Sequence, residues 1–461
     1  MDSTTQSVAP SSALYPPTVS CPREPLPLHR FLFRFVDNPL ASVPQLAYEQ
    51  PMTVAEVGGG IKVAWVSGPE LTEQILIKEA SAFNKSDMEK RVFRKSAGDG
   101  VLTADGPHWR WQRRAMAPLF RHADILSYVP TMSAVATEAA DRWVSPGRRE
   151  IDDDMIAATF AVISRTMLDD GEPDETQRLI AATHDYLAAV PWEMAWEIFS
   201  LPEWLPHPAS WRMSRAARKL RSFVAAIIER RKSSPEAVAD DLLERLLATR
   251  NPDTGAPMSD DQLIDNLLTL LEAGHETTAR ALTFTLYLLA RAPDWQDKVR
   301  AEILNVCGDG NITASHMNEL TVTKQVLEES MRLYPPAPVV ARRAIRPITI
   351  GDVTFSPRDQ IIIPIFAIHR HRQLWDDPDK FDPDRFAPDA IQDRPRTQYL
   401  PFGAGPRICL GQSFALIEAI VLLATFVRKA RFEWDGHYAP EPVSRVTLRP
   451  RGGMPLTVVP F

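Results

Sequence analysis

The chain has few cysteines and no long apolar run. Three cysteines among 461 residues (Cys21, Cys307 and Cys409) are too few for a disulfide framework. We therefore expect a protein of a reducing compartment, the cytoplasm. The first residues are rich in Ser, Thr and Pro and lack the apolar run that a signal peptide or a membrane anchor requires. Neither is expected, and residues 1–28 are predicted to form a flexible tail.

The chain also lacks an excess of basic residues. It has 52 Lys and Arg against 59 Asp and Glu, and its formal net charge is −7. This balance argues against general nucleic-acid binding, which requires a basic surface. The chain has neither a Gly-x-Gly-x-x-Gly motif nor a cysteine cluster that could hold an iron–sulfur centre. If the protein performs redox chemistry, its electrons are expected to come from a separate partner.

What the chain does have is a glycine-rich segment around one cysteine. Residues 401–411 read Pro-Phe-Gly-Ala-Gly-Pro-Arg-Ile-Cys-Leu-Gly. Arg407 can reach an anionic group beside Cys409, and a following helix would lower the pKa of the thiol. Three glycines allow positive φ and close backbone approach, as a loop against a flat cofactor needs: Gly403, Gly405 and Gly411. The alternative is a buried free cysteine in a turn.

The segment matches the pattern Phe-x-x-Gly-x-Arg-x-Cys-x-Gly at Phe402, Gly405, Arg407, Cys409 and Gly411. It resembles the heme-binding loop of the cytochrome P-450 family, the heme-thiolate monooxygenases. The resemblance implies heme b (iron protoporphyrin IX) as cofactor, with the Cys409 thiolate as iron ligand. Phe402, Arg407 and Gly411 would then lie beside the heme.

A second element resembles the same family. Trp109 and Arg113 are four residues apart, hence on one helix face, and they match the Trp-x-x-x-Arg element that holds heme propionates. Arg342 is expected to reach a propionate in preference to Arg343. The neighbouring basic residues are interpreted as exposed, and they could dock an acidic electron-transfer protein: Arg110, Arg114 and Arg121.

Residues 259–292 give the longest helical signal, with a capping box at Ser259 and Gln262. Its middle reads Ala-Gly-His-Glu-Thr-Thr from Ala273. A glycine costs about 1 kcal/mol inside a helix, and a Thr hydroxyl can bond back one turn and bend the helix. The bend would leave a groove for O2 and a water. The alternative is helix packing through a small residue.

The resemblance extends to this helix, where Glu276 and Thr277 match the family's acid–alcohol pair. They are predicted to be catalytic, delivering protons during oxygen activation. Ala273 and Gly274 are expected to line the substrate pocket, together with three residues near the C-terminal half: Ala337, Val339 and Val446. His275 is interpreted as a packing or surface residue.

Glu329 and Arg332 are three residues apart on a predicted helix and match the family's Glu-x-x-Arg pair. Arg385, from the segment Phe-Asp-Pro-Asp-Arg-Phe, would complete a buried structural cluster with them. Upstream, residues 53–66 alternate around Gly58–Gly60 and predict a β-hairpin. Residues 83–104 show no clean period and are predicted to form a long loop.

The fold implied is mainly α with small β-sheets: one triangular domain over residues 29–461, with a long helix crossing over the heme. We expect a monomeric enzyme of the soluble bacterial branch. It would insert one oxygen atom from O2 into a C–H bond or double bond of a small hydrophobic substrate. Electrons would come from NAD(P)H through a ferredoxin or flavodoxin-type reductase partner.

Several alternatives stay open. Fatty acids or other lipids lead as substrates over terpenoids, steroids and aromatic compounds, because the segments expected to line the pocket are mostly apolar. A peroxide-driven or isomerase-type heme-thiolate enzyme ranks lower, since such relatives usually lose the acid–alcohol pair. A heme sensor or gas carrier without turnover is the alternative from another functional class.

Overall fold

The computed structural model describes residues 13–57, 60–167, 173–198, 201–202, 204–233 and 241–461. This part of the chain contains fifteen α-helices and twelve β-strands. The helices are α1 (Leu28–Asp37), α2 (Pro69–Glu73), α3 (Asp87–Ala97), α4 (Gly106–Met116), α5 (His122–Leu126), α6 (Val129–Ala140), α7 (Ile151–Met167), α8 (Pro173–Ile198), α9 (Ser210–Ser233), α10 (Leu242–Ala248), α11 (Asp260–Arg291), α12 (Pro293–Cys307), α13 (Thr321–Leu333), α14 (Ile365–Ile368) and α15 (Gln412–Lys429).

The strands are β1 (Met52–Val57), β2 (Ile61–Val66), β3 (Phe83–Lys85), β4 (Gly147–Glu150), β5 (Val340–Ala344), β6 (Ile348–Ile350), β7 (Val353–Phe355), β8 (Gln360–Ile363), β9 (Ala430–Glu433), β10 (Pro442–Ser444), β11 (Leu448–Pro450) and β12 (Pro455–Pro460). The largest sheet has the order β1-β2-β8-β5-β3. Its first two strands pair from Met52 opposite Val66 to Val57 opposite Ile61, which confirms the predicted hairpin. The glycines Gly58 and Gly59 lie outside the described residues.

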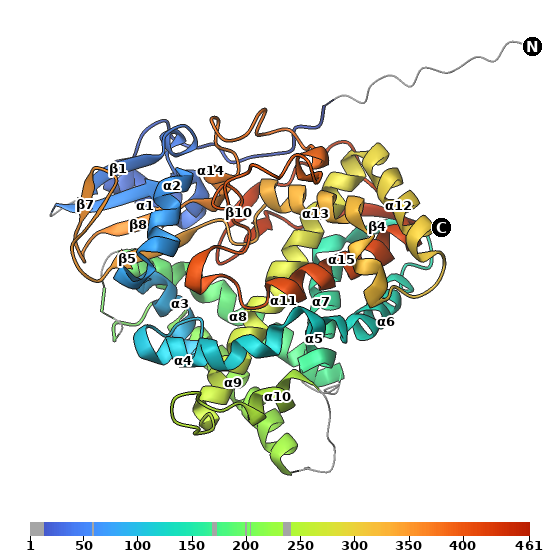
Figure 1. Cartoon of the computed structure of the whole chain (residues 1–461), viewed down its shortest axis with the longest axis horizontal. Coiled ribbons are helices and arrows are strands. Elements are labelled where there is room, and N and C mark those ends of the chain that lie inside the picture. Colours follow the sequence, from blue (N-terminus) through green and yellow to red (C-terminus); the bar gives the residue numbers. More distant parts are fainter. Residues whose placement is uncertain (1–12, 58–59, 168–172, 199–200, 203, 234–240) are drawn as a thin grey trace, which may run out of the picture.

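Figure 1 shows the five-stranded sheet on one side of the molecule and most helices on the other, with an outline that tapers toward α9 and α10. The mainly helical fold with small sheets is therefore the one expected from the sequence. The helix α11 runs through the middle and packs against α7, α9, α13 and α15. Because many of its side chains are buried between these neighbours, it forms the centre of the larger hydrophobic core.

The ends of α11 lie where the sequence predicts them. Ser259 is the N-cap; its hydroxyl accepts a hydrogen bond from the Gln262 amide, and the Gln262 side chain accepts one from the Ser259 amide. Pro293 begins the next helix directly after the C-cap Ala292. Both signals are local, because a cap needs only residues within one turn.

The prediction of a long loop over residues 83–104 is wrong. The segment forms β3 and α3, and the hydroxyl of Ser86 caps α3 by accepting a hydrogen bond from the Glu89 amide. The inward face of α3 mixes the apolar Val92 and Ala97 with the polar Arg91 and Ser96, whose partners come from distant helices. An inward face that is half polar gives only a weak hydrophobic period, which explains why the apolar pattern did not indicate this helix.

Part of the predicted N-terminal tail packs against the body of the molecule. The amide of Phe381 donates a hydrogen bond to the carbonyl of Leu14, and the hydroxyl of Tyr334 donates one to the carbonyl of Pro17. Val19 is buried in the larger core. Residues 13–27 therefore belong to the packed body, which corrects the tail prediction there. Residues 1–12 lie outside the described part of the chain.

Candidate functional site

The loop around Cys409 crosses close to the segment that follows α2. Gly403 and Gly405 both have φ +73°. A Cβ atom on Gly405 would lie 1.9 Å from the carbonyl oxygen of Leu76, so only glycine fits there. Gly411 has φ −89° and is the N-cap of α15, so it does not use the positive φ that glycine allows. The close contact that requires glycine at position 405 is therefore with the backbone of Leu76.

The side chain of Cys409 is accessible, although the residue lies deep in the fold. Its backbone amide donates a hydrogen bond to the carbonyl of Phe402 (2.9 Å), which closes the loop. Burial raises the pKa of the thiol, while the Gly411 amide and the Arg113 charge lower it. Both groups favour the thiolate, which is the form that binds a metal.

Arg113 of α4 is half-buried and has no ion-pair partner among the carboxylates of the described chain. Burial lowers its pKa and the nearby Cys409 raises it. The indole of Trp109, one turn earlier, lies under the guanidinium of Arg407, whose carbon is 4.3 Å from the ring centroid. Arg407 also pairs with Asp105 at 2.5 Å. The predicted residues of α4 and the cysteine loop are therefore brought together.

Arg342 and Arg343 lie on opposite faces of β5. Arg343 pairs with Asp87, whereas Arg342 is 7% exposed and donates only to the carbonyl of Ala341 (2.9 Å). Burial lowers the pKa of Arg342. Within the part of the chain that the structure describes, no carboxylate forms an ion pair with it. Arg342 is therefore the one of the two with charge available for a ligand.

Two further lysines near this region were not predicted. Lys85 stands opposite Arg342 in the β3–β5 pairing, and burial lowers its pKa. Lys90 of α3 pairs with Asp105, which also holds Arg407. Both lysines fall in the segment expected to be a loop, so no helix or strand face was available from which to place them.

These groups fit a flat anionic cofactor such as heme. A thiol that can ligate iron lies beside Arg113, and both Arg113 and Arg342 lack a carboxylate partner in the described chain. A buried guanidinium without an anion is costly unless a ligand supplies the negative charge. Among the described residues, no cluster of three His, Cys, Asp or Glu could hold a bare metal ion. Iron bound by this cysteine alone would therefore need a cofactor to complete its ligands.

In the middle of α11, Ala273 is exposed and Thr277 is half-buried, while the helix on either side is buried. The Thr277 hydroxyl donates to the carbonyl of Ala273 (2.9 Å), which is the predicted back-bond. A Cβ atom on Gly274 would lie 2.6 Å from Cδ1 of Ile163 on α7. Gly274 thus lets two helices pack closely, and its place in the substrate pocket stays a prediction. His275 is buried and packs edge-on against Phe160.

Glu276 is held by two guanidinium groups. Its Oε1 atom is 3.2 Å from Arg280 and 3.0 Å from Arg449 of β11. Burial acts to raise the pKa of this carboxyl, but Arg449, Arg280 and His275 lower it overall. The carboxylate therefore stays ionised. Glu276 and Thr277 have separate partners and do not hydrogen-bond each other. Arg280, one turn along α11, was readable from the sequence, whereas Arg449 is 173 residues away.

The remaining predicted pocket residues come from two loops that meet. The amide of Leu448 donates a hydrogen bond to the carbonyl of Pro336 (2.9 Å). This bond places the β10–β11 turn, which carries Val446, against the segment that carries Ala337 and Val339. All three pocket residues are half-buried.

The Glu329–Arg332 pair of the structural cluster is fully buried. Arg332 forms two hydrogen bonds with Glu329, at 2.7 and 2.8 Å, and both side chains are 0% exposed. Arg385 lies 3.7 Å from Glu329. The structure therefore brings together the three residues that the sequence grouped.

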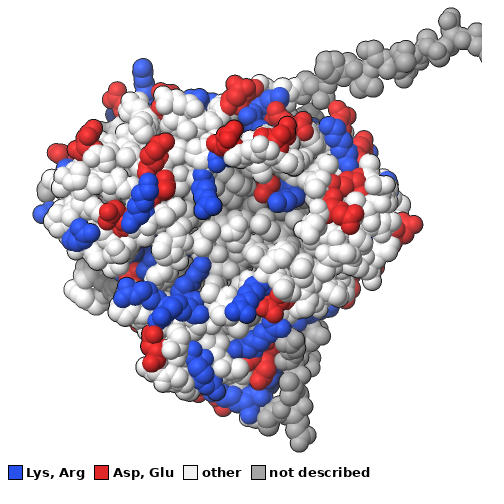
Figure 2. Space-filling model, viewed as in Figure 1, with Lys and Arg blue, Asp and Glu red and all other residues white. Residues whose placement is uncertain are grey.

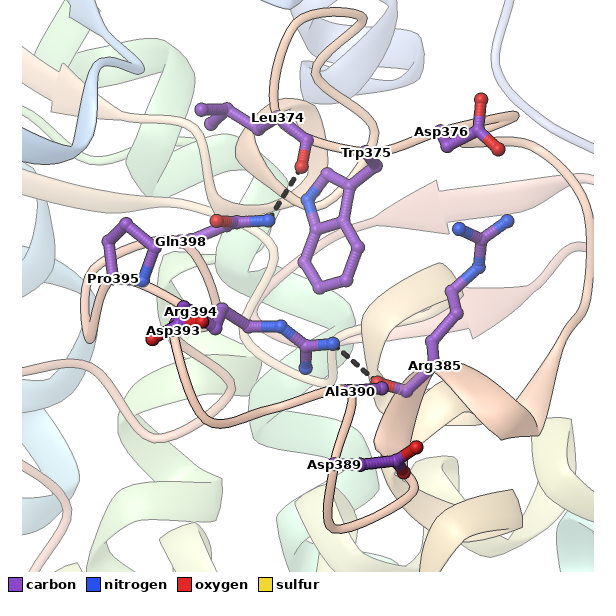
Figure 3. A pocket seen from close by; sticks show the side chains of 10 residues that line it. All are labelled: Leu374, Trp375, Asp376, Arg385, Asp389, Ala390, Asp393, Arg394, Pro395 and Gln398. Carbon is purple, nitrogen blue, oxygen red and sulfur yellow. Dashed lines mark hydrogen bonds between the residues drawn. The ribbon is translucent and has the colours of Figure 1, made fainter.

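Two depressions lie outside this interior region. One of about 390 Å³ surrounds Trp375, and Figure 3 shows its indole between the side chains of Arg394 and Arg385. It contains none of the predicted cofactor or catalytic residues. The other, of about 250 Å³, lies along the cysteine loop and is lined by Phe402 and Ile408, among others.

Figure 2 shows one face of the molecule with a mostly uncharged hollow near its centre. Lys and Arg side chains gather below this hollow, over the region of α4 and α9 in Figure 1. Arg110, Arg114 and Arg121 are exposed, as predicted, and Arg114 pairs with Asp253. No helix of the described chain has both the length and the apolar character needed to cross a membrane.

Comparison with known proteins gives a consistent result. The family model described as Cytochrome P450 matches residues 21–455. A cytokinin hydroxylase from Arabidopsis thaliana is 32% identical over 410 residues, covering 85% of this chain and 78% of that protein. Cyclooctatin synthase from Streptomyces melanosporofaciens is 30% identical over 396 residues, covering 85% and 84%.

A cyclooctat-9-en-7-ol 5-monooxygenase from the same Streptomyces is 31% identical over 369 residues, covering 79% of this chain and 78% of that protein. Among solved structures, the heme domain of cytochrome P450DA superposes with a TM-score of 0.81 and 25% identity, covering 97% of this chain and 98% of that one. The relatives include plant and bacterial proteins, so this similarity does not select the bacterial branch.

Proposed function

Because the chain belongs to the cytochrome P450 family, we propose that it inserts one oxygen atom from O2 into a C–H bond or double bond of a small hydrophobic substrate. Family membership makes it an oxidoreductase of the monooxygenase type. The observation that carries the proposal is the group of residues around Cys409. The thiol lies beside Arg113, and Arg342 supplies a second interior guanidinium group that has no carboxylate partner in the described chain.

Heme b would be held by the Cys409 thiolate, with Trp109, Arg113, Arg342 and Arg407 as donors to its propionates. When bound, the cofactor supplies the oxygen chemistry that no side chain can perform. The glycines of the loop fix the backbone that presents the thiol. The buried Glu329 cluster supports this region, because its charges are paired and hydrogen-bonded.

Thr277 and Glu276 would control protons. The Thr277 hydroxyl lies at the accessible point of α11 and can hold a water or a proton next to the reacting oxygen. Glu276 is ionised and fixed by Arg280 and Arg449. A proton passing between Glu276 and Thr277 would need a bridging water, because no hydrogen bond joins the two side chains.

Electrons would come from NAD(P)H through a separate ferredoxin or flavodoxin-type partner. Exposed Arg110 and Arg121, with Arg114, lie over the region of α4, on which Trp109 and Arg113 also stand. A basic surface attracts an acidic partner and speeds encounter. We propose that this face is the docking site of the partner and that the enzyme acts as a monomer in the cytoplasm.

The substrate is proposed to be apolar because the pocket segments carry Ala337, Val339 and Val446. Long-chain lipids such as fatty acids fit this composition. A compact ring compound is the second candidate, and the name of one relative favours it: cyclooctat-9-en-7-ol 5-monooxygenase. The presence of both Glu276 and Thr277 favours an O2-dependent enzyme over a peroxide-driven or isomerase-type one.

The test is the absorption spectrum of the purified holoenzyme, reduced and treated with carbon monoxide. The wild-type protein is expected to show the red-shifted band that only a thiolate ligand produces, and Cys409→Ser to lose it completely. With NAD(P)H and a ferredoxin reductase system, the wild type should form oxygenated product. An unchanged carbon monoxide spectrum in Cys409→Ser would overturn the thiolate assignment. A normal spectrum without turnover would favour the sensor.

A further inference from the structure

Glu272, directly before Ala273 on α11, has a carboxyl group with an incomplete set of partners. Its Oε2 atom accepts a hydrogen bond from the hydroxyl of Ser96 on α3 (3.0 Å). Its Oε1 atom is buried and has no hydrogen-bond partner in the described chain. Burial raises the pKa of this carboxyl to about 8, although the Ser96 hydrogen bond acts to lower it. Since buried polar atoms normally have partners, this oxygen needs an explanation.

The position of Glu272 places it on the wall of the site. Successive residues of a helix are separated by about 100° around its axis. Glu272 therefore lies on the side of α11 next to the exposed Ala273. The helices α3 and α8 pack against each other, and α3 packs against α11 (Figure 1). Tyr186 of α8 joins this group, and its hydroxyl donates to the carbonyl of Val92 on α3 (2.6 Å). The carboxyl therefore lies where three helices meet beside the accessible point of α11.

The cations near this wall already have anionic partners. Lys95, one residue before Ser96 on α3, forms an ion pair with Glu193 of α8. Arg221 of α9 pairs with Asp265 at 2.5 Å. No ion pair joins Glu272 to a Lys or Arg in the part of the chain that is described. The carboxyl thus keeps one hydrogen-bonding position that no group of the described chain fills.

We propose that Glu272 determines substrate specificity by forming a hydrogen bond with a hydroxyl or amino group of an otherwise apolar substrate. The inference rests on the proposed monooxygenase function and narrows its substrate class. A site built to hydrogen-bond a substrate group discriminates strongly against analogues that lack it, because the buried partner is then left unpaired.

The same wall disfavours a substrate carboxylate. When Glu272 is ionised, a substrate carboxylate would place a second negative charge in the same buried site, at a large penalty. When Glu272 is protonated, it supplies no positive charge to stabilise a buried carboxylate. A free fatty acid therefore ranks below the alcohol and the amine of the same chain length. This reverses the substrate order expected from apolar composition alone.

Four probes of similar size test the proposal by calorimetric titration of the holoenzyme at about pH 9, where Glu272, with a pKa of about 8, is mostly ionised and only accepts hydrogen bonds: octan-1-ol, octylamine, octanoate and 1-methoxyheptane. The last has the size of octan-1-ol but no hydrogen-bond donor. Wild-type protein is expected to bind octan-1-ol and octylamine at least tenfold more tightly than the other two. Glu272→Leu should lose this preference. Glu272→Gln should keep the preference for octan-1-ol and lose that for octylamine, which separates hydroxyl from ammonium recognition.

The same ranking in wild type and Glu272→Leu, tightest binding of octanoate, or no binding of any probe would overturn the role of Glu272. Heme content and the carbon monoxide spectrum of each variant report the proposed function separately. An abnormal wild-type spectrum means that the proposed function fails, whereas a normal spectrum with an unchanged ranking rejects only the specificity role. If Glu272→Leu does not fold, Glu272→Gln tests the proposal instead. Loss of the preference for octylamine supports the role of Glu272, and retention of that preference overturns it.

Discussion

Two carboxyl groups, one turn apart on α11, have opposite surroundings. Glu276 faces Arg280 and Arg449, and its pKa is lowered below the ordinary value. Glu272 has one hydrogen bond, from Ser96, and its pKa is raised to about 8. The same residue type on the same helix is therefore ionised at one position and largely protonated at the other near neutral pH.

The difference separates groups that hold the fold from groups that await a ligand. Charges with complete partners, such as Glu276 and the Glu329–Arg332 pair, stabilise the arrangement of distant segments. Groups with incomplete partners, such as Glu272, Arg113 and Arg342, border the site. Three experiments on four variants, in order of decreasing effect on the free energy of unfolding, test this difference.

The largest effect is expected from Arg280→Leu, which breaks the complete network. Arg280 pairs with Glu276 and Asp152, and its side chain is 6% exposed. Removing it leaves the buried Glu276 and the half-buried Asp152 short of a partner, so the free energy of unfolding should fall by about 3–5 kcal/mol. Urea denaturation of the holoenzyme measures the change. The control is Arg346→Leu, from an exposed pair with Glu79 at 3.8 Å, which should cost about 1 kcal/mol or less. Equal losses would refute the comparison.

The pH dependence of stability gives an intermediate effect and opposite signs for the two carboxylates. The folded pKa of Glu276 is lowered, so its contribution is present above the unfolded pKa and is lost as the pH falls through the folded value. Glu276→Gln should therefore be most destabilised, relative to wild type, near pH 7. The folded pKa of Glu272 is about 8, so wild type loses stability as the pH rises from about 4.5 toward 8.

Glu272→Gln should accordingly gain stability relative to wild type over the range in which Glu276→Gln is most destabilised. Chemical denaturation at several pH values between about 4 and 9 measures both differences. Curves that run parallel for the two variants would show that the two carboxyl groups titrate alike and would remove the basis of the comparison.

The smallest effect on stability is expected from Thr277→Ala, which removes one half-buried hydrogen bond worth about 1 kcal/mol. Its effect should appear in function, as more hydrogen peroxide released per product formed. The matched control is Thr285→Ala on the same helix, because the Thr285 hydroxyl also bonds back one turn, to Ala281 (2.6 Å), and is buried. Unchanged coupling in Thr277→Ala would exclude Thr277 from proton delivery.

Much of the fold could be predicted from the sequence because its signals are local. The capping box of Ser259 and Gln262 and the β1–β2 hairpin each depend on residues a few positions apart. The helix α3 was missed because its buried residues Arg91 and Ser96 are polar, and their partners lie on α8 and α11. A polar buried face gives no local sign of burial.

The sequence by itself determined the family, through motifs whose spacing reflects single turns and loops: the Cys409 loop, Trp109 with Arg113, and Glu329 with Arg332. Only the tertiary structure decided which charges are paired. It turned Arg342 inward and Arg343 toward Asp87, and it brought Arg449 to Glu276. The physical reason is that desolvation and Coulomb energies depend on distances between side chains far apart in the chain, and packing alone sets those distances.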